Sequence, residues 1–253
     1  MEADWYGAAF GVSYSPTDRF TWGLGPHFLH GDLDGGSDYD ADSQAWGVDA
    51  GLAARPQWGA FKPLLTAAFS ATFHDLDQSR RDSVGGRYRS DPEANVYTLL
   101  GAASHEFFPT GGDSLILRPK LGLNWTRATF DGYEESTRRG LRPLSVSGGN
   151  YTSLQSDLGA ALVFQPMETL NLEVRAAWLH EWRDRSPVLN SAIAGAGLGL
   201  FTPVANPSRE AAGLGASADW SPTENLTLSL DYDAAIGDNL TSQAVSGTLR
   251  WDF

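Results

Sequence analysis

The last nine residues of the chain alternate strictly between two kinds of side chain. One face takes Val245, Gly247, Leu249, Trp251 and Phe253, and the other takes Ser246, Thr248, Arg250 and Asp252. Because successive side chains of a β-strand point to opposite faces, this segment is predicted to be a strand with one apolar and one polar side. The same alternation recurs along the whole chain, which predicts an all-β protein.

Eleven strands are predicted from this pattern. The alternation is less clear in the fourth and fifth of them than elsewhere. The predicted strands lie near residues 5–14, 20–30, 43–55, 61–74, 94–108, 115–130, 151–164, 170–184, 209–220, 226–236 and 243–253.

Composition narrows the class of protein. No apolar run approaches the roughly 18 residues of a transmembrane helix, although barrel strands need only alternating apolar residues. The chain has no cysteine, which excludes disulfides and thiol chemistry. Its net charge of −13 argues against nucleic acid as a partner. The opening residues lack the basic start and apolar core of a signal peptide, so we expect that Met1 is not the natural start.

Aromatic residues gather near the ends of the predicted strands. A soluble sandwich favours large apolar residues at mid-strand, whereas a lipid-facing barrel carries aromatic girdles at both membrane interfaces. This distribution predicts an antiparallel transmembrane β-barrel. The residues assigned to the girdle are Trp22, Trp125, Trp178, Trp182 and Trp220.

The faces opposite the apolar ones carry charged side chains. In a membrane barrel they would line a water-filled lumen, and in a soluble sheet they would simply face solvent. The lumen is the preferred interpretation. The residues predicted to line it are Arg118, Lys120, Glu173, Arg175, Glu181 and Arg250.

Short and long connections alternate along the chain, as periplasmic turns and extracellular loops do in outer-membrane barrels. This polarity places Phe253 on the short-turn side and the start of the first strand on the long-loop side. Bacterial single-chain barrels normally have an even number of strands. We therefore expect an eleven-strand part of a twelve-strand barrel, with one strand missing before Trp5.

Several segments together resemble the β-domain of autotransporters, the translocators of type V secretion. The resemblance spans almost the whole chain and lies in the order and spacing of segments rather than in one motif. The segments are GAAFGVSYSP at 7–16, DSQAWGVDAGLAAR at 42–55, LRPKLGLNW at 117–125, DGYEE at 131–135, SLQSDLGAAL at 153–162, LEVRAAWLHEW at 172–182, AAGLGASADW at 211–220, LTLSLDY at 226–232 and VSGTLRWDF at 245–253.

The resemblance implies a twelve-stranded barrel in the outer membrane of a Gram-negative bacterium, with a pore helix leading to a secreted N-terminal passenger. Residues 1–253 would be a single translocator domain without its first strand, pore helix and passenger. The implied partners are membrane lipid and lipopolysaccharide, the barrel-assembly machinery with periplasmic chaperones, and the passenger itself. The residues that match the family's C-terminal insertion signal are Gly247, Leu249, Trp251 and Phe253. Alternatively, Phe253 is only a lipid-facing anchor.

No catalytic residue, metal site or cofactor is predicted. His180-Glu181 lacks the second histidine of a zinc-protease motif, and His180 is expected between Trp178 and Trp182 at the membrane interface. The acidic segment 31–42 does not have EF-hand spacing and is interpreted as a solvated outer loop, and the arginines of 80–89 could meet lipopolysaccharide phosphates. The alternatives to a translocator are an outer-membrane pore without an export role and a secreted glycan-binding β-sandwich.

Overall fold

The fold is taken from a computed structural model of the chain. It describes residues 2–34, 39–59, 61–81, 86–109, 114–137, 143–183, 188–193, 199–203, 208–238 and 241–252. Within these ranges every regular element is a β-strand. The same residues contain no helix of sufficient length and apolarity to cross a membrane.

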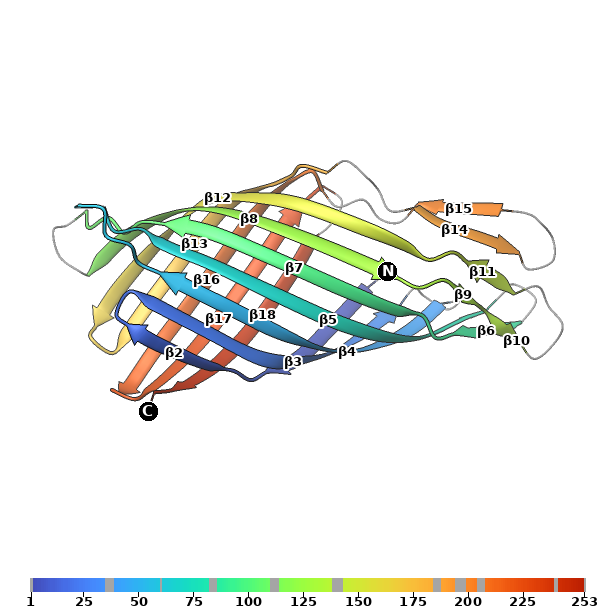
Figure 1. Ribbon diagram of the computed structural model, residues 1–253, viewed down its shortest axis with the longest axis horizontal. Helices are drawn as coiled ribbons and strands as arrows, with labels where there is room; N and C mark the ends of the chain where they lie inside the picture. The colour runs from blue at the N-terminus through green and yellow to red at the C-terminus, as the bar shows by residue number, and fades with distance from the viewer. Residues whose placement is uncertain are drawn as a thin grey trace.

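One antiparallel sheet curls through the molecule (Figure 1). Its strands follow one another in sequence order, so each pairs with its neighbours along the chain. β1 and β2 are successive parts of the first strand, and both pair with β3. The strands are β1 (Glu2–Ala9), β2 (Val12–Thr17), β3 (Phe20–Asp34), β4 (Tyr39–Ala54), β5 (Leu64–Arg81), β7 (Glu93–Ser104), β8 (Leu115–Phe130), β12 (Gly149–Met167), β13 (Leu170–Glu181), β16 (Glu210–Thr223), β17 (Leu226–Gly237) and β18 (Thr241–Trp251).

Each of the eleven predicted strands has a counterpart in this sheet, so the predicted fold class is confirmed. The first strand differs from its prediction because Phe10 and Gly11 interrupt it between β1 and β2. Several strands are also longer than predicted at the end with long connections. The interpretation of segment 31–42 as a solvated outer loop is wrong for much of its length, since β3 continues to Asp34 and β4 begins at Tyr39.

Short strands occupy parts of the predicted long loops and extend the molecule at one end (Figure 1). They form two groups, with β6 and β10 attached to β5 and the other four making a separate small sheet. Arg80 links β5 to the segment between β9 and β10. Its Nε and Nη2 donate to the carboxylate of Glu135 in that segment at 2.5 and 2.6 Å. The short strands are β6 (Arg87–Ser90), β9 (Tyr133–Glu134), β10 (Ser136–Thr137), β11 (Leu144–Val146), β14 (Val188–Ile193) and β15 (Gly199–Pro203).

The two ends of the sheet differ in character. The tight turns and the C-terminus lie at one end, whereas the N-terminus and the long connections lie at the other (Figure 1). Three of the tight turns are two-residue links, at 18–19, 168–169 and 224–225. The alternation of short and long connections is therefore present in three dimensions.

Large apolar side chains lie on the outside of the sheet, not in a core. Among the described residues the fully buried apolar side chains are few and mostly alanine or valine, whereas exposed tryptophan, phenylalanine and leucine abound on every strand of the sheet. A soluble protein rarely exposes a continuous apolar surface of this extent. The outer face is instead suited to lipid, as on a transmembrane barrel. Examples from the middle of the strands are Leu24, Val48, Leu121, Leu158, Val174, Leu214 and Leu230.

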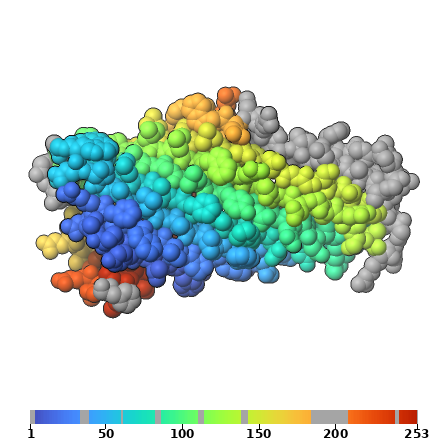
Figure 2. Space-filling model, viewed as in Figure 1, coloured from blue at the N-terminus to red at the C-terminus, as the bar shows by residue number. Residues whose placement is uncertain are grey.

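The first and last strands form the two edges of the curled sheet. Among the described residues, β1 and β2 pair only with β3, and β18 pairs only with β17. The last strand lies near the first, since residues 9–13 and Thr248 line one cavity of about 770 Å³. Figure 2 shows the red C-terminal end just below the blue first strands. Unpaired strand edges carry backbone groups that can accept another strand.

Candidate functional site

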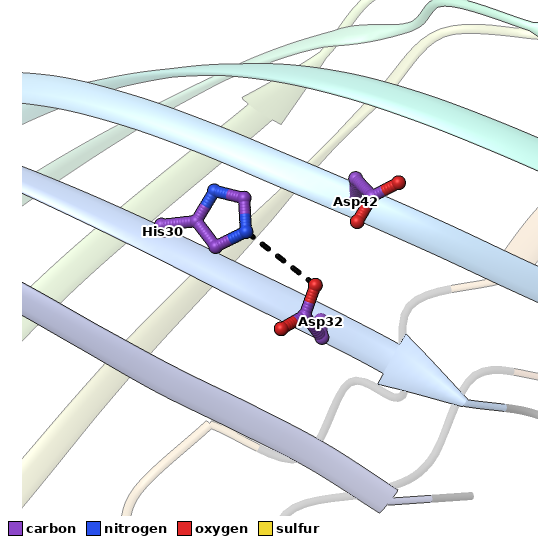
Figure 3. Close-up of side chains that lie close together, drawn as sticks. All are labelled: His30, Asp32 and Asp42. Carbon is purple, nitrogen blue, oxygen red and sulfur yellow. Dashed lines mark ion pairs between the residues drawn. The ribbon is translucent and has the colours of Figure 1, made fainter.

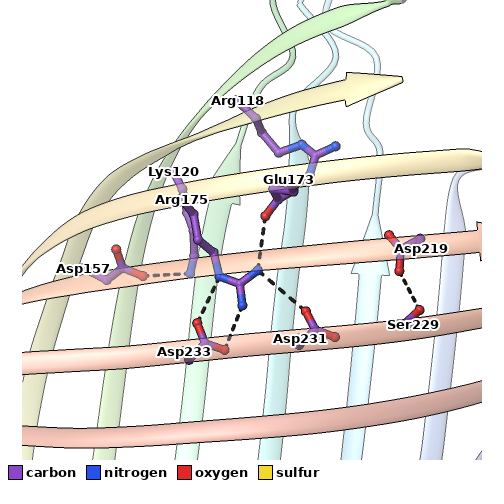
Figure 4. A network of polar contacts seen from close by, with 9 residues as sticks. All are labelled: Arg118, Lys120, Asp157, Glu173, Arg175, Asp219, Ser229, Asp231 and Asp233. Atoms are coloured by element: carbon purple, nitrogen blue, oxygen red, sulfur yellow. Dashed lines mark hydrogen bonds and ion pairs between the residues drawn. The ribbon is translucent and has the colours of Figure 1, made fainter. Parts of the chain in front are cut away.

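A network of charged side chains lies on the face of the sheet opposite the exposed apolar one (Figure 4). On β13, Leu172, Val174 and Trp178 are exposed, while Glu173 and Arg175 between them are half-buried. The period of two places Glu173 and Arg175 together on the inner face. Arg118 and Lys120 reach the same face from β8, through the register of β8 with β12 and of β12 with β13.

Arg175 is the centre of the network. Its Nε and Nη2 donate to the two carboxylate oxygens of Asp233 at 3.0 and 2.8 Å. Its Nη1 lies 3.5 Å from a Glu173 oxygen and 3.7 Å from an Asp231 oxygen. A bidentate guanidinium–carboxylate pair fixes both geometry and charge, so the orientation of Arg175 is well defined.

The network continues along the inner wall by alternating charges. Arg118 donates from Nη1 to Glu173 at 2.9 Å and from Nη2 to Glu106 at 3.0 Å. Arg55 extends it from the β4–β5 connection, with its Nη1 3.6 Å from a Glu106 oxygen. Lys120 forms a separate pair with Asp157 at 2.7 Å. A cavity of about 660 Å³ is lined by residues of this wall, including Arg118, Lys120, Glu173 and Arg175.

Small residues between the charged ones let the side chains meet across strands. Arg175 and Asp233 stand on strands that are not neighbours, since β16 lies between β13 and β17. Gly215 of β16 is directly opposite both residues in register. A Cβ at Gly215 would collide with Nε of Arg175. The absence of a side chain there is what allows the guanidinium to cross β16.

Replacing Gly215 with valine is therefore expected to force Arg175 away from Asp233. Loss of this partly exposed bidentate pair should lower the free energy of unfolding by about 1–2 kcal/mol. Urea titration of the detergent-folded barrel, followed by tryptophan fluorescence, measures the change. Gly213→Val is the matched control, because a Cβ there meets its neighbours at ordinary distances of 3.5 Å and more. Equal destabilisation by both variants would contradict the role given to Gly215.

The six predicted lumen residues do not all belong to this network. Arg118, Lys120, Glu173 and Arg175 line the cavity together. Glu181 lies farther along β13 and is buried, where it accepts hydrogen bonds from Ser153 and from the backbone N–H groups of Leu154 and Arg183. Arg250 is on the edge strand β18, with its Nε 3.3 Å from Asp252.

Sequence reasoning did not single out the acidic partners of the network. Asp157, Asp231 and Asp233 each stand on the polar face of a predicted strand, so the period of two could have found them. Glu106 follows the end of β7 and has no such signal. The lining of a water-filled lumen by these residues stays a prediction.

Four of the five predicted girdle tryptophans fall at two levels on the outer face. Trp22 and Trp220 lie near the tight turns, and Trp178 and Trp182 lie near the long connections. These four are exposed, whereas Trp125 is half-buried. His180 packs between Trp178 and Trp182, with ring centroids 5.4 and 4.6 Å away, and pairs with Glu210 at 2.7 Å.

The two levels are separated by a distance that suits a membrane. Trp220 is opposite Leu170 in register, and Trp178 is eight residues farther along β13. At about 3.4 Å per residue this is about 27 Å along the strand. A strand tilt of about 40° reduces it to roughly 20 Å, near the apolar band of about 25 Å in outer-membrane barrels. The assignment of these residues to membrane interfaces stays a prediction.

The residues of the predicted insertion signal lie on the edge strand. Gly247, Leu249 and Trp251 share the outer face of β18, where all described residues are exposed. They are opposite Leu230, Leu228 and Leu226 of β17 in register. Phe253 lies outside the described residues.

Comparison with known proteins identifies the family. Residues 1–233 match the family described as "Autotransporter beta-domain". A comparison with curated proteins gave no match. Among solved structures, the chain is similar to the translocator domain of the autotransporter NalP from Neisseria meningitidis, with a TM-score of 0.79 at 14% identity over 99% of this chain and 80% of that one.

Two further solved autotransporter domains share the fold. The β-domain of the Bordetella autotransporter BrkA has a TM-score of 0.69 at 15% identity, covering 99% of this chain and 92% of that one. The transport unit of AIDA-I from Escherichia coli has a TM-score of 0.60 at 14% identity, covering 99% of this chain and 83% of that one. These likenesses concern the fold.

The chain thus belongs to the autotransporter β-domain family. It is a translocator barrel of type V secretion, located in the outer membrane of a Gram-negative bacterium. The resemblance inferred from the order of the sequence segments is confirmed.

Proposed function

We propose that the charged inner wall guides the passenger of this translocator while it crosses the membrane in an extended form. A polypeptide in transit exposes backbone N–H and C=O groups, which need hydrogen-bond partners when bulk water is restricted. Arg118, Lys120 and Arg175 offer donors, and their carboxylate partners offer acceptors.

The observation that carries this proposal is the mutual pairing of the wall charges. Arg175 already contacts three carboxylates, and Arg118 contacts two. A cation that is paired in this way attracts a passing carboxylate less strongly than a free one, because its charge is largely compensated. The wall can therefore exchange hydrogen bonds with a moving chain without trapping it.

Export of a reporter passenger tests this function. A signal peptide, an epitope-tagged passenger and a helix-forming linker are fused, in this order, in front of the full chain. Antibody binding to intact cells measures surface exposure of the epitope. We expect the wild-type barrel to display the epitope and the Arg118→Met/Arg175→Met double variant to display it several-fold less. Arg19→Met is the control, because Arg19 lies in a tight turn outside the network, where its Nη2 donates to Gln57 at 2.9 Å.

The outcome also separates a translocator from a barrel without an export role. A passenger that stays in the periplasm with the wild-type chain, although the barrel shows its heat-dependent gel shift, would favour a simple pore. If the double variant exports the passenger as well as the wild type does, the network has no guiding role, although the barrel still acts in export.

We assign transport rather than catalysis to the inner face. One hydrogen-bonded series has the order of a catalytic triad, since His27 joins Asp49 through Nδ1 at 2.9 Å and Thr72 through Nε2 at 3.0 Å. Thr72 is buried, so a substrate cannot reach its hydroxyl without displacing the wall. The series is suited to satisfying buried polar groups, and we give it this structural role.

Two partners are inferred from the surface of the barrel. The exposed edge of β18 suits capture by strand addition, the means by which assembly machinery could receive it. Arg81, Arg87 and Arg89 are exposed at the end with long connections, where guanidinium groups could contact lipopolysaccharide phosphates.

A further inference from the structure

Three potential metal ligands meet on the outer wall near the long connections (Figure 3). They are His30 and Asp32 of β3 and Asp42 of β4, and each offers one ligand atom within 4.8 Å of the other two. His30 Nε2 is already 3.4 Å from an Asp32 oxygen. One nitrogen and two carboxylate oxygens at this separation form a mixed donor set, not only a group of acids.

The strand register explains why the three groups converge. Asp32 is directly opposite Asp42, and His30 precedes Asp32 by two residues and therefore shares its face. Both strands continue beyond the membrane-facing apolar residues, so their backbones hold the ligands on a paired and regular scaffold. The two chain segments thus need only side-chain rotation to approach a common ion.

The two carboxylates sit in a longer row of like charges. Asp4 of β1 is opposite Asp32, and Asp77 of β5 is opposite Asp42, so four aspartates cross four adjacent strands at one level. Like charges directly opposite each other destabilise a strand pair. No lysine or arginine forms an ion pair with Asp32 or Asp42 among the residues that the structure describes. A divalent cation would compensate this repulsion.

The site is open on the side away from the sheet. Asp32 and Asp42 are exposed, and His30 is half-buried. Phe28 and Trp46, two and four residues nearer the tight turns, are exposed on the same outer face. Three protein ligands and an open position are the arrangement of a metal site that keeps water or an external group as its fourth ligand.

We propose that His30 Nε2 and the carboxylates of Asp32 and Asp42 bind one divalent transition-metal ion, of the class of Zn²⁺, on the outer wall. Bonds of about 2.0–2.2 Å place two ligands of one tetrahedral ion about 3.4 Å apart. His30 Nε2 and the Asp32 oxygen already have this separation, and the remaining pairs, which lie within 4.8 Å, close by a movement of at most about 1.4 Å. The imidazole selects this class, because Mg²⁺ and Ca²⁺ take oxygen ligands.

Calorimetric titration with Zn²⁺ tests the site. The full chain is folded in a non-ionic detergent without an oligohistidine tag, and Co²⁺ absorption provides a second reading on the wild type. We expect one Zn²⁺ per chain and Co²⁺ bands in the visible. Because each variant removes one of three ligands, His30→Gln and Asp42→Asn should each weaken binding at least tenfold.

His180→Gln is the matched control. His180 also lies on the outer wall between aromatic rings, but it has only one carboxylate partner, Glu210. Its loss should leave Zn²⁺ binding unchanged. The heat-dependent gel shift confirms that each variant is folded, and Asp32→Asn replaces any variant that fails this check.

Three results would overturn the proposal. In the first, His30→Gln binds Zn²⁺ as tightly as the wild type. In the second, Mg²⁺ displaces Zn²⁺ at equal concentration, which would reduce the site to diffuse attraction by the aspartate row. Absence of both a stoichiometric heat signal and Co²⁺ bands in the wild type would also reject it, whatever the variants show.

Discussion

Replacing Gly25 with valine should remove the folded form of the barrel almost completely. Gly25 lies on the inner face of β3, where Phe10 and Gly11 interrupt the first strand. A Cβ at Gly25 would collide with the carbonyl oxygen of Phe10 and lie 2.6 Å from Cα of Gly11. Both obstacles are backbone atoms, so no side-chain rotation relieves the clash. We expect a loss of more than about 3 kcal/mol, or release of β1 and β2 from the sheet.

The measurement is the fraction of heat-modifiable protein after refolding into detergent, together with protease resistance of the first strands. Gly101→Val provides the control, since a Cβ at Gly101 meets nothing within 4 Å. Gly101 also stands within a long regular strand, β7, so the change in β-propensity is comparable. If Gly25→Val refolds as well as Gly101→Val, the close approach of β3 to the interrupted first strand is wrong.

Replacing Phe253 with serine should have the second largest effect, and only in cells. If the last strand presents an insertion signal, loss of its aromatic end should greatly reduce the amount of barrel in the outer membrane. Folding into detergent should be little affected, because a single lipid-exposed aromatic contributes modestly to stability. The folded band on a gel is quantified in outer-membrane fractions, to measure assembly in cells, and after refolding, to measure folding into detergent.

Phe164→Ser separates an insertion signal from a lipid anchor. Phe164 is an exposed aromatic near the tight-turn end of β12, the same end of the sheet at which β18 stops. The anchor interpretation predicts equal loss for the two variants in cells. The signal interpretation predicts that only Phe253→Ser fails there.

The sheet was predictable from the sequence because lipid and water face opposite sides of each strand. This contrast imposes the period of two on β8, β13 and β18, and all eleven strands follow from it. Beyond the membrane both faces meet water, so the contrast disappears while the hydrogen-bonded ladder continues. The segments between the predicted strands, 31–42 and 75–93 among them, are therefore interpreted from the sequence as loops, although β3, β4, β5 and β6 occupy much of them.

The charged wall was predictable only in part, for a related reason. Alternation identifies the face on which Arg118 and Arg175 lie. It does not show which side chains, two strands apart, can meet because the residue between them is small. The contact of Arg175 with Asp233 depends on Gly215, and the metal candidate depends on a register that pairs Asp32 with Asp42. Such partners can be identified only when the register between neighbouring strands is known, and the alternation within one strand does not give that register.

The two cavities on the inner side have unlike walls. One is bounded by the charged network of β8, β13 and β17. The other lies against β2, β3 and β4, where its inward positions include Ser13, Gly23 and Gly51. A polypeptide inside the barrel would meet ion-paired side chains on one side and small residues on the other. If the passenger crosses along this face as proposed, its bulky side chains are expected to fit better beside the small residues of β2, β3 and β4 than beside the ion-paired wall.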